Sequence, residues 1–218
     1  MDKYLSIITN FGCHYSCPYC IVKNNYIDVP ETTVGGLDKL VENIRKYKCN
    51  WVSISGGGDP LYCLHDHLDW WQTVINTVPA DVQLELHTSY ISAKEWPFDQ
   101  FDRIVYHCRK IKDLYKITQS RPNQKIRVVF VVTEDFTPQM IDDIAAIVRH
   151  HPDIDELSFR QMVGKNYETT HYCEDYLKHG HQKDWWYIEQ RDYNIYYAEN
   201  EVYFKYEDFV HEETECAR

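Results

Sequence analysis

The stretch that decides the fold is Ile126-Arg127-Val128-Val129-Phe130-Val131-Val132. It is a nearly continuous apolar run of mostly β-branched residues, which is typical of a strand covered on both faces. Thr137-Pro138 then predicts the start of a helix, because proline is favoured at the first helical position. Apolar residues recur at helical spacing after it, at Ile141, Ile144, Ala145 and Val148. A buried strand followed by an amphipathic helix is the repeating unit of an α/β protein.

The same alternation extends in both directions along the chain. Strands are predicted at 3–9, 50–55, 82–88, 101–107, 125–133 and 156–162, and helices near 34–48, 64–78, 110–118 and 137–150. Strands joined by helical connections predict a parallel sheet with right-handed crossovers. The 218 residues suffice for one well-buried domain but not for two of ordinary size.

Three cysteines follow the first predicted strand, in Cys13-His14-Tyr15-Ser16-Cys17-Pro18-Tyr19-Cys20. This C-x3-C-x2-C spacing allows three thiolates to hold three irons of a [4Fe–4S] cluster. The fourth iron then stays open to bind a further ligand. No fourth cysteine follows nearby, which favours a chemical site over one for electron transfer alone.

Two other interpretations of these cysteines stay open. A zinc site would use Cys13, Cys17 and Cys20 together with His14, although adjacent residues are awkward tetrahedral ligands. A disulfide needs an oxidising compartment, and nothing near the N-terminus indicates one. The other five cysteines are scattered singly and give no pattern for a second cluster.

A glycine-rich segment, Gly56-Gly57-Gly58-Asp59-Pro60, directly follows the second predicted strand. Glycine has no Cβ, so its backbone can approach a ligand closely. Alone, such a run predicts only a turn. It comes one strand–helix–strand unit after the cysteines, however, and the two motifs together predict one site.

With these motifs the chain resembles the radical S-adenosylmethionine (radical SAM) superfamily. The matching residues are Cys13, Cys17, Tyr19 and Cys20, for the cluster loop, and Gly57-Gly58-Asp59-Pro60, for the family's Gly-Gly-Glu-Pro segment. Asp59 stands where the family usually has Glu. The resemblance implies a [4Fe–4S] cluster whose open iron binds the amino and carboxylate groups of SAM. It also implies that the glycine segment receives the methionyl amine and that Tyr19 lies near the adenine.

The resemblance further implies the architecture, an α/β partial (β/α)6 barrel over residues 1–163. Residues 164–218 would form an extension of the same domain that covers the barrel's edge or mouth. In such barrels, functional side chains lie at the carboxyl ends of the strands. This rule adds SAM-binding candidates at His87, Ser89, His107 and Arg109, and substrate candidates at Glu134, Arg160 and Gln161.

The tail is rich in aromatic residues and holds nine of the 18 tyrosines. The run from Tyr193 to Tyr206 predicts a β-hairpin that turns at Ala198-Glu199-Asn200. Such a hairpin can cover an open sheet edge. Tail aromatics, with Trp185 and Trp186 as candidates, would add flat walls suited to stacking a nucleobase.

The net charge of −11 conceals a basic stretch at 103–127, with eight cations and one acid. Two interpretations stay open, a solvated helix face and a local phosphate or carboxylate site. The overall acidity argues against tight non-specific binding of duplex DNA.

The chain shows no leader-like start and no apolar run of membrane-spanning length, so we expect no membrane partner and a cytoplasmic, reducing compartment. For a phage-encoded member this would be the host cytosol.

These observations predict a radical SAM enzyme that cleaves SAM reductively and abstracts hydrogen from a nucleoside or a modified nucleobase, free or within a nucleic acid. The small single-cluster format resembles enzymes that rearrange hypermodified thymidines in bacteriophage DNA. Such an enzyme needs an electron donor such as flavodoxin or ferredoxin. One alternative is a glycyl-radical-enzyme activase. The other is a non-catalytic iron–sulfur or zinc binding module, which would leave SAM intact.

Overall fold

The computed structural model describes residues 2–91, 96–179, 184–190 and 194–209, and its strands fall where the sequence predicts them. The six predicted strands correspond to β1 (Tyr4–Thr9), β2 (Trp51–Gly56), β3 (Gln83–Thr88), β4 (Arg103–His107), β5 (Lys125–Val132) and β6 (Glu156–Gln161). The predicted hairpin is confirmed as β8 (Ile195–Ala198) and β9 (Glu201–Tyr203), although Tyr193 lies outside the described residues. A further short strand, β7 (Trp186–Ile188), was not predicted.

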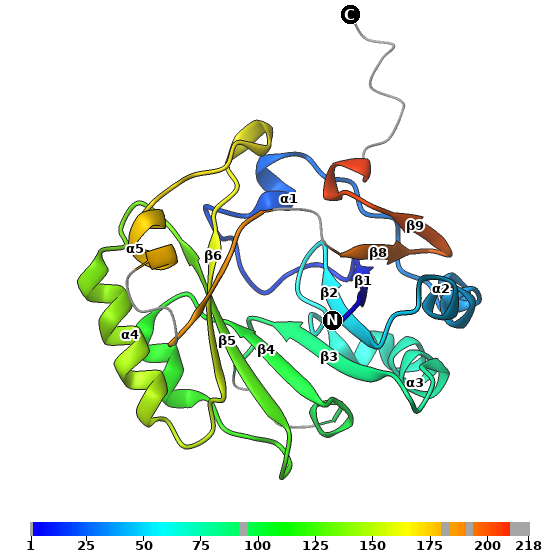
Figure 1. Ribbon diagram of the computed structural model, residues 1–218. Coiled ribbons are helices and arrows are strands. Elements are labelled where there is room, and N and C mark those ends of the chain that lie inside the picture. The colour runs from blue at the N-terminus through cyan, green and yellow to red at the C-terminus, as the bar shows by residue number, and fades with distance from the viewer. Residues whose placement is uncertain (1, 92–95, 180–183, 191–193, 210–218) are drawn as a thin grey trace, which may run out of the picture. The chain divides into compact units, whose positions relative to one another are not determined.

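The protein is an α/β protein with a nine-stranded, mostly parallel sheet (Figure 1). The strand order is β7-β6-β5-β4-β3-β2-β1-β8-β9. The pairs β1–β2, β1–β8, β3–β4, β4–β5, β5–β6 and β6–β7 are parallel, and β8–β9 is antiparallel. The order has two ends, so the sheet is not closed into a barrel.

The helices are shorter than the sequence pattern predicts. The α-helices are α1 (Ile21–Asn24), α2 (Leu40–Tyr47), α3 (Leu68–Thr77), α4 (Pro138–His150) and α5 (Glu174–His179). The 3-10 helices are η1 (Gly35–Leu37), η2 (Leu64–His67), η3 (Phe98–Gln100), η4 (Ile111–Lys116), η5 (Lys165–Tyr167) and η6 (Tyr206–Asp208). Among the described helices, none is both long enough and apolar enough to cross a membrane.

One helix prediction is wrong in type. The segment 110–118 contains the 3-10 helix η4 and no α-helix. The cause is a side-chain contact, because the Asp113 carboxylate accepts hydrogen bonds from the backbone N–H groups of Arg109 and Lys110 at 3.3 and 3.1 Å. Such bonds compete with helical ones and tighten the turn. The α4 prediction is confirmed, with Pro138 at its start and a hydrogen bond of 3.2 Å from Met140 N to the Thr137 hydroxyl.

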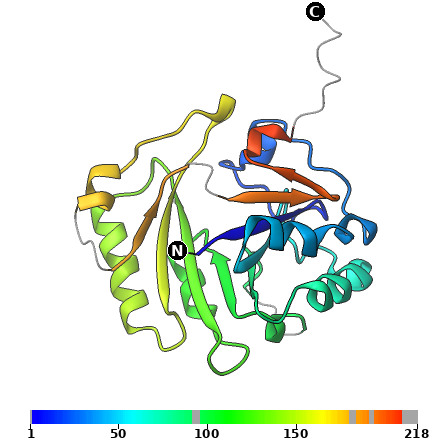
Figure 2. The same ribbon diagram turned by 45° about the vertical axis from the view of Figure 1, so that its right-hand side comes forward.

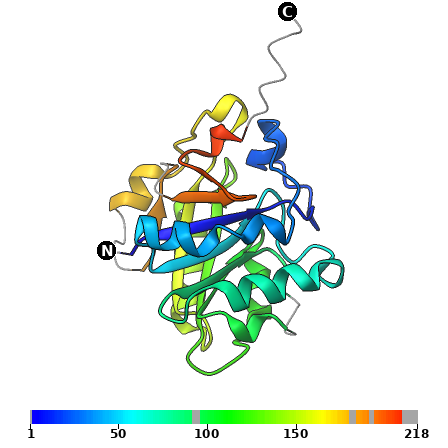
Figure 3. The same cartoon turned by 90° about the vertical axis from the view of Figure 1, so that its right-hand side faces the viewer.

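The chain divides into two compact units, the first comprising Met1–Leu84 and Asp192–Arg218, the second Glu85–Arg191. In the first unit β1 lies between β2 and β8, and α2 and α3 lie beside these strands (Figure 3). The tail hairpin thus covers the β1 edge that β2 leaves free. The hairpin is attached through Tyr197, whose hydroxyl donates to Gly36 O at 2.8 Å, and through Glu199, which accepts from Thr33 N at 2.8 Å.

In the second unit the two faces of the strands differ sharply. Successive side chains of a strand point to opposite faces. One face is apolar and packs against α4 (Figure 2), and its buried residues include Ile104, Tyr106, Ile126, Val128, Phe130, Leu157 and Phe159. The opposite face, called the polar face below, carries charged and polar residues among valines such as Val105 and Val129. Several of the predicted site residues belong to it.

Candidate functional site

The cysteine loop runs from the end of β1 to the start of α1. Cys13 is exposed and Cys17 and Cys20 are half-buried. Tyr15 N donates a hydrogen bond of 3.4 Å to Cys13 Sγ, and Cys20 N donates to Cys17 O at 3.2 Å. The three thiols are therefore reachable from solvent on one short loop. Tyr19 is half-buried on the same loop.

The donor set of this loop fits thiolate ligation. No disulfide joins any of the seven described cysteines, and Cys216 lies outside the described residues. Cys49 and Cys108 are buried, and burial raises the pKa of each thiol, which makes them poor ligands. Within the described ranges no group of three or more His, Cys, Asp or Glu side chains is arranged to hold a metal ion. The loop thus supplies thiols of the predicted type, but their sulfur atoms are not arranged to hold one metal ion.

The glycine turn packs directly onto this loop. Gly57 N donates to Thr9 O at 2.7 Å, and Asp59 N donates to Gly12 O at 2.8 Å. A Cβ on Gly58 would lie only 1.9 Å from Gly12 O, so only glycine fits here. Gly12 immediately precedes Cys13, and the two predicted motifs are therefore joined by backbone contacts.

Asp59 and Pro60, which complete the turn, are both buried. The Asp59 carboxylate accepts from Leu61 N at 3.1 Å, and its backbone carbonyl accepts from Tyr62 N at 2.9 Å. A short acid suits this Asx-type turn, because its oxygen reaches a backbone N–H two residues ahead. A structural role of Asp59 is therefore visible, and its role toward SAM stays a prediction.

In the second unit, two predicted residues meet on the polar face. His87 Nδ1 on β3 lies 3.0 Å from His107 Nε2 on β4. His87 Nε2 lies 2.6 Å from Glu85 Oε1, and the other Glu85 oxygen pairs with Arg103. Arg103 also lies 3.7 Å from Glu156, which pairs with Arg127. Charged and imidazole groups thus form one continuous chain over β3 to β6.

Burial and neighbouring charges set the protonation of this chain. Burial would raise the pKa of Glu85, but the charge and hydrogen bond of His87, with the charges of Arg103 and Arg127, outweigh it and lower the pKa to about 2. Burial, followed by the charges of His87 and Arg160, lowers the pKa of His107 to about 3. Glu85 is therefore ionised and His107 is neutral near pH 7.

The other candidates of the second unit lie in varied surroundings. Ser89 is half-buried, and Arg109 and Glu134 are exposed. Gln161 is buried and already used, since its amide donates to Thr170 O and accepts from Gln190 N, both at 3.0 Å. Arg160 is half-buried and donates to Gln190 Oε1 at 3.0 Å.

The two tail tryptophans differ in position. Trp185 is buried in the core, edge-on to Phe159, and its indole N–H donates to Leu177 O at 2.9 Å. Trp186 is 66% exposed on β7. Of the pair, only Trp186 presents an open ring surface to a ligand.

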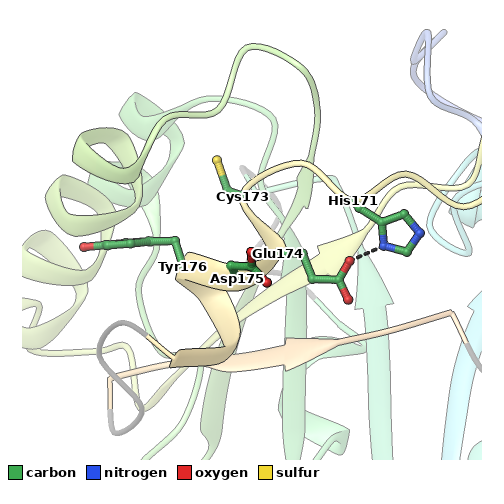
Figure 4. A pocket seen from close by; sticks show the side chains of 5 residues that line it. All are labelled: His171, Cys173, Glu174, Asp175 and Tyr176. Carbon is green, nitrogen blue, oxygen red and sulfur yellow. Dashed lines mark hydrogen bonds and ion pairs between the residues drawn. The ribbon is translucent and has the colours of Figure 1, made fainter.

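A surface pocket of about 360 Å³ lies elsewhere in the second unit, before and along α5 (Figure 4). Its lining residues are His171, Cys173, Glu174, Asp175 and Tyr176. Cys173 Sγ donates to Phe136 O at 3.2 Å, and burial raises the pKa of this thiol. Glu174 is already paired with His171 and Lys178. Cys173 and Glu174 thus already have partners within the protein, and none of the five lining residues was a predicted site residue.

Glu85, Arg103 and Ser158 share the polar face with predicted residues but were not themselves predicted. A signal for them existed in the pattern of the strands. Glu85-x-His87 and Ser158-x-Arg160 place polar residues at alternate positions of their strands, with Leu86 and Phe159 between them. Polar pairs at this spacing indicate one shared face.

No protein-family model matches this chain, and a search of curated proteins likewise finds no match.

Proposed function

We propose that this protein is a radical SAM enzyme with a partial (β/α)6 barrel and a nucleoside or modified nucleobase as its substrate. When bound, a [4Fe–4S] cluster and SAM supply a 5′-deoxyadenosyl radical that abstracts hydrogen from an unactivated C–H bond. The observation that carries the proposal is the direct packing of the glycine turn on the start of the cysteine loop.

Cys13, Cys17 and Cys20 would hold the cluster, because the loop presents three exposed or half-buried thiols outside any disulfide. The Tyr15 N–H directed at Cys13 Sγ suits a thiolate, since hydrogen bonds to sulfur stabilise its negative charge. A reducing cytoplasm keeps such thiols available. The electron would come from a flavodoxin- or ferredoxin-like donor.

Gly57, Gly58 and Asp59 would position SAM through their backbone, which the contacts with Thr9 and Gly12 hold in place. The close approach of Gly58 to Gly12 makes the two motifs one rigid corner of the first unit. A ligand that bridges the cluster and the turn would therefore meet preorganised groups.

The experiment is anaerobic reconstitution followed by a SAM cleavage assay. We expect about four irons and four sulfides per chain, with formation of 5′-deoxyadenosine. Cys13→Ala, Cys17→Ala and Cys20→Ala should each abolish cleavage. Cys63→Ala is the matched control, because Cys63 is also an exposed thiol of the first unit. Full activity of Cys17→Ala, or of protein that holds zinc alone, would refute the proposal, and metal binding with intact SAM would indicate a binding module.

The substrate class is tested by coupling. A true substrate should raise 5′-deoxyadenosine formation well above the uncoupled background, and deuterium at its reacting carbon should appear in the product. Nucleosides, nucleotides and modified DNA form the test panel. Background cleavage with all of these, and stimulation by a peptide or a small acid, would contradict the nucleoside assignment.

A further inference from the structure

The polar face of the second unit carries a row of four side chains over four neighbouring strands. His107 is paired in register with Val129, Val129 with Ser158, and Ser158 with Trp186. Registered partners on adjacent parallel strands point to the same face. Arg160 lies two residues beyond Ser158 and therefore shares that face.

Three groups of this face have hydrogen-bonding capacity that the protein does not use. Ser158 is fully buried, and its Oγ has no hydrogen-bond partner. Among the described residues, His107 Nδ1 has no hydrogen-bond partner and Arg160 has no carboxylate partner. Burying a polar group without a partner is costly, and Ser158 is such a group on the same face as two half-buried side chains with spare hydrogen-bonding capacity. This combination indicates a ligand. Trp186, 66% exposed, adds an open aromatic surface.

Nε2 of His107 begins a series of hydrogen-bonded side chains that ends at the Glu85 carboxylate. His107 Nε2 lies 3.0 Å from His87 Nδ1, and His87 Nε2 lies 2.6 Å from Glu85 Oε1. Glu85 is ionised, so His87 donates its Nε2 hydrogen to it. When both rings are neutral, His87 Nδ1 must then accept the Nε2 hydrogen of His107, which leaves His107 Nδ1 with a free lone pair.

We propose that this face binds the substrate and that His107 is its general base, with the proton relayed to His87. In the step, the X–H bond of a substrate hydroxyl or amine breaks and an Nδ1–H bond forms on His107. The Nε2–H bond of His107 breaks as an Nδ1–H bond forms on His87. His107 remains neutral, and the positive charge appears on His87 beside the Glu85 carboxylate.

The relay explains how a half-buried ring can act as a base. Desolvation opposes a positive charge on His107, whereas His87 gains the attraction of Glu85. The charged groups that surround the two rings are Glu85 on β3, Arg103 on β4, Arg127 on β5, and Glu156 and Arg160 on β6. Arg103 pairs with Glu85 and Arg127 pairs with Glu156. Glu85 also contacts His87 directly, so the ring beside this carboxylate carries the positive charge.

The unused groups also indicate the class of substrate. A flat ring suits Trp186, a hydroxyl suits Ser158, and an anionic oxygen suits Arg160. A nucleoside 5′-phosphate combines these features, and this assignment rests on the proposed function. His87 and His107 would then serve the substrate's proton and not SAM.

The first test is nitrogen-15 NMR of the histidine rings in the metal-free full-length chain. Near neutral pH we expect both rings to carry hydrogen on Nε2. Whenever His87 is an imidazolium, its Nδ1–H must donate to His107 Nε2, so His107 should then be neutral with its hydrogen on Nδ1. His87→Gln and His107→Gln assign the signals. An imidazolium on His107, or an unchanged His107 tautomer as His87 is protonated, would overturn the relay.

The second test is titration of the metal-free chain with thymidine 5′-monophosphate and with thymidine. The nucleotide should bind more tightly than the nucleoside, and Arg160→Gln should remove the difference. Trp186→Leu should weaken binding about five- to hundred-fold, as expected for a stacked base. Phe204→Leu is the matched control, because Phe204 is an exposed aromatic residue of the first unit, 56% accessible. Absent binding, or equal loss in both aromatic variants, would overturn the ligand assignment.

These measurements need neither cluster nor SAM, so they separate the two proposals. A chain that shows the relay and binds the nucleotide but never cleaves SAM would refute the radical SAM function alone. A chain that cleaves SAM but lacks the tautomer change would refute the relay alone.

Discussion

Replacing Gly58 with alanine tests whether the turn and the cysteine loop form one structural unit. The added Cβ would lie 1.9 Å from Gly12 O and 2.5 Å from Gly12 C. Carbon atoms in contact sit about 3.5–4.0 Å apart, so the two backbone segments must separate by about 1.5 Å. That separation breaks the 2.8 Å hydrogen bond from Asp59 N to Gly12 O.

The magnitude follows from two contributions. A lost hydrogen bond costs about 1 kcal/mol, and overpacking costs about 1–3 kcal/mol. We therefore expect Gly58→Ala to lower the free energy of unfolding by about 2–4 kcal/mol, measured by urea denaturation of the metal-free chain. Iron incorporation should also fall, because Gly12 immediately precedes Cys13.

Gly35→Ala is the matched control in the same unit. Its Cβ would meet only Thr33 Oγ1, at 3.9 Å, so its stability should change by less than about 0.5 kcal/mol. If Gly58→Ala unfolded at the same urea concentration as Gly35→Ala and took up normal iron, the inferred contact between the two motifs would be refuted.

Three further predictions concern stability, each measured by urea unfolding. Glu85 has a folded-state pKa of about 2 against an ordinary value of 4.5, so its contribution of about 3 kcal/mol is present above pH 4.5 and is lost as the pH falls toward 2. Glu85→Gln should flatten this pH dependence, and an unchanged slope would contradict the ionised assignment. Tyr197→Phe removes the hydroxyl that lies 2.8 Å from Gly36 O and should cost about 1–2 kcal/mol; a neutral effect would show that the hairpin is not attached there. Thr137→Ala removes the α4 cap that accepts from Met140 N and should cost about 1 kcal/mol, whereas equal stability would mean that Pro138 alone starts the helix.

The strands were predictable because their signal is local. The β5 run from Ile126 to Val132 is apolar at nearly every position, and a strand with this pattern needs both faces covered whatever its neighbours are. All six predicted strands are present within one or two residues of their expected bounds. The helices were less predictable, since η4 depends on the particular hydrogen bonds of Asp113 and not on apolar spacing.

The cysteine loop and the glycine turn were recognisable for the same reason, as short motifs with defined spacing. Their relation to each other was not. From the sequence, Gly58 was expected to let a ligand approach closely, whereas in the structure Gly12, 46 positions earlier, already occupies that side of Gly58. A spacing rule does not show which backbone atoms will meet.

By itself, then, the sequence determined the α/β class, the six parallel-type strands and the two motifs, because each depends on residues close together in the chain. The tertiary structure decided which distant side chains share a face. Glu85, His87 and His107 meet through the register of β3 and β4, and His107, Ser158 and Trp186 align only because β4, β5, β6 and β7 pair in sequence. Register is a property of the whole sheet, and a shift of one residue in any strand would move its side chain to the opposite face.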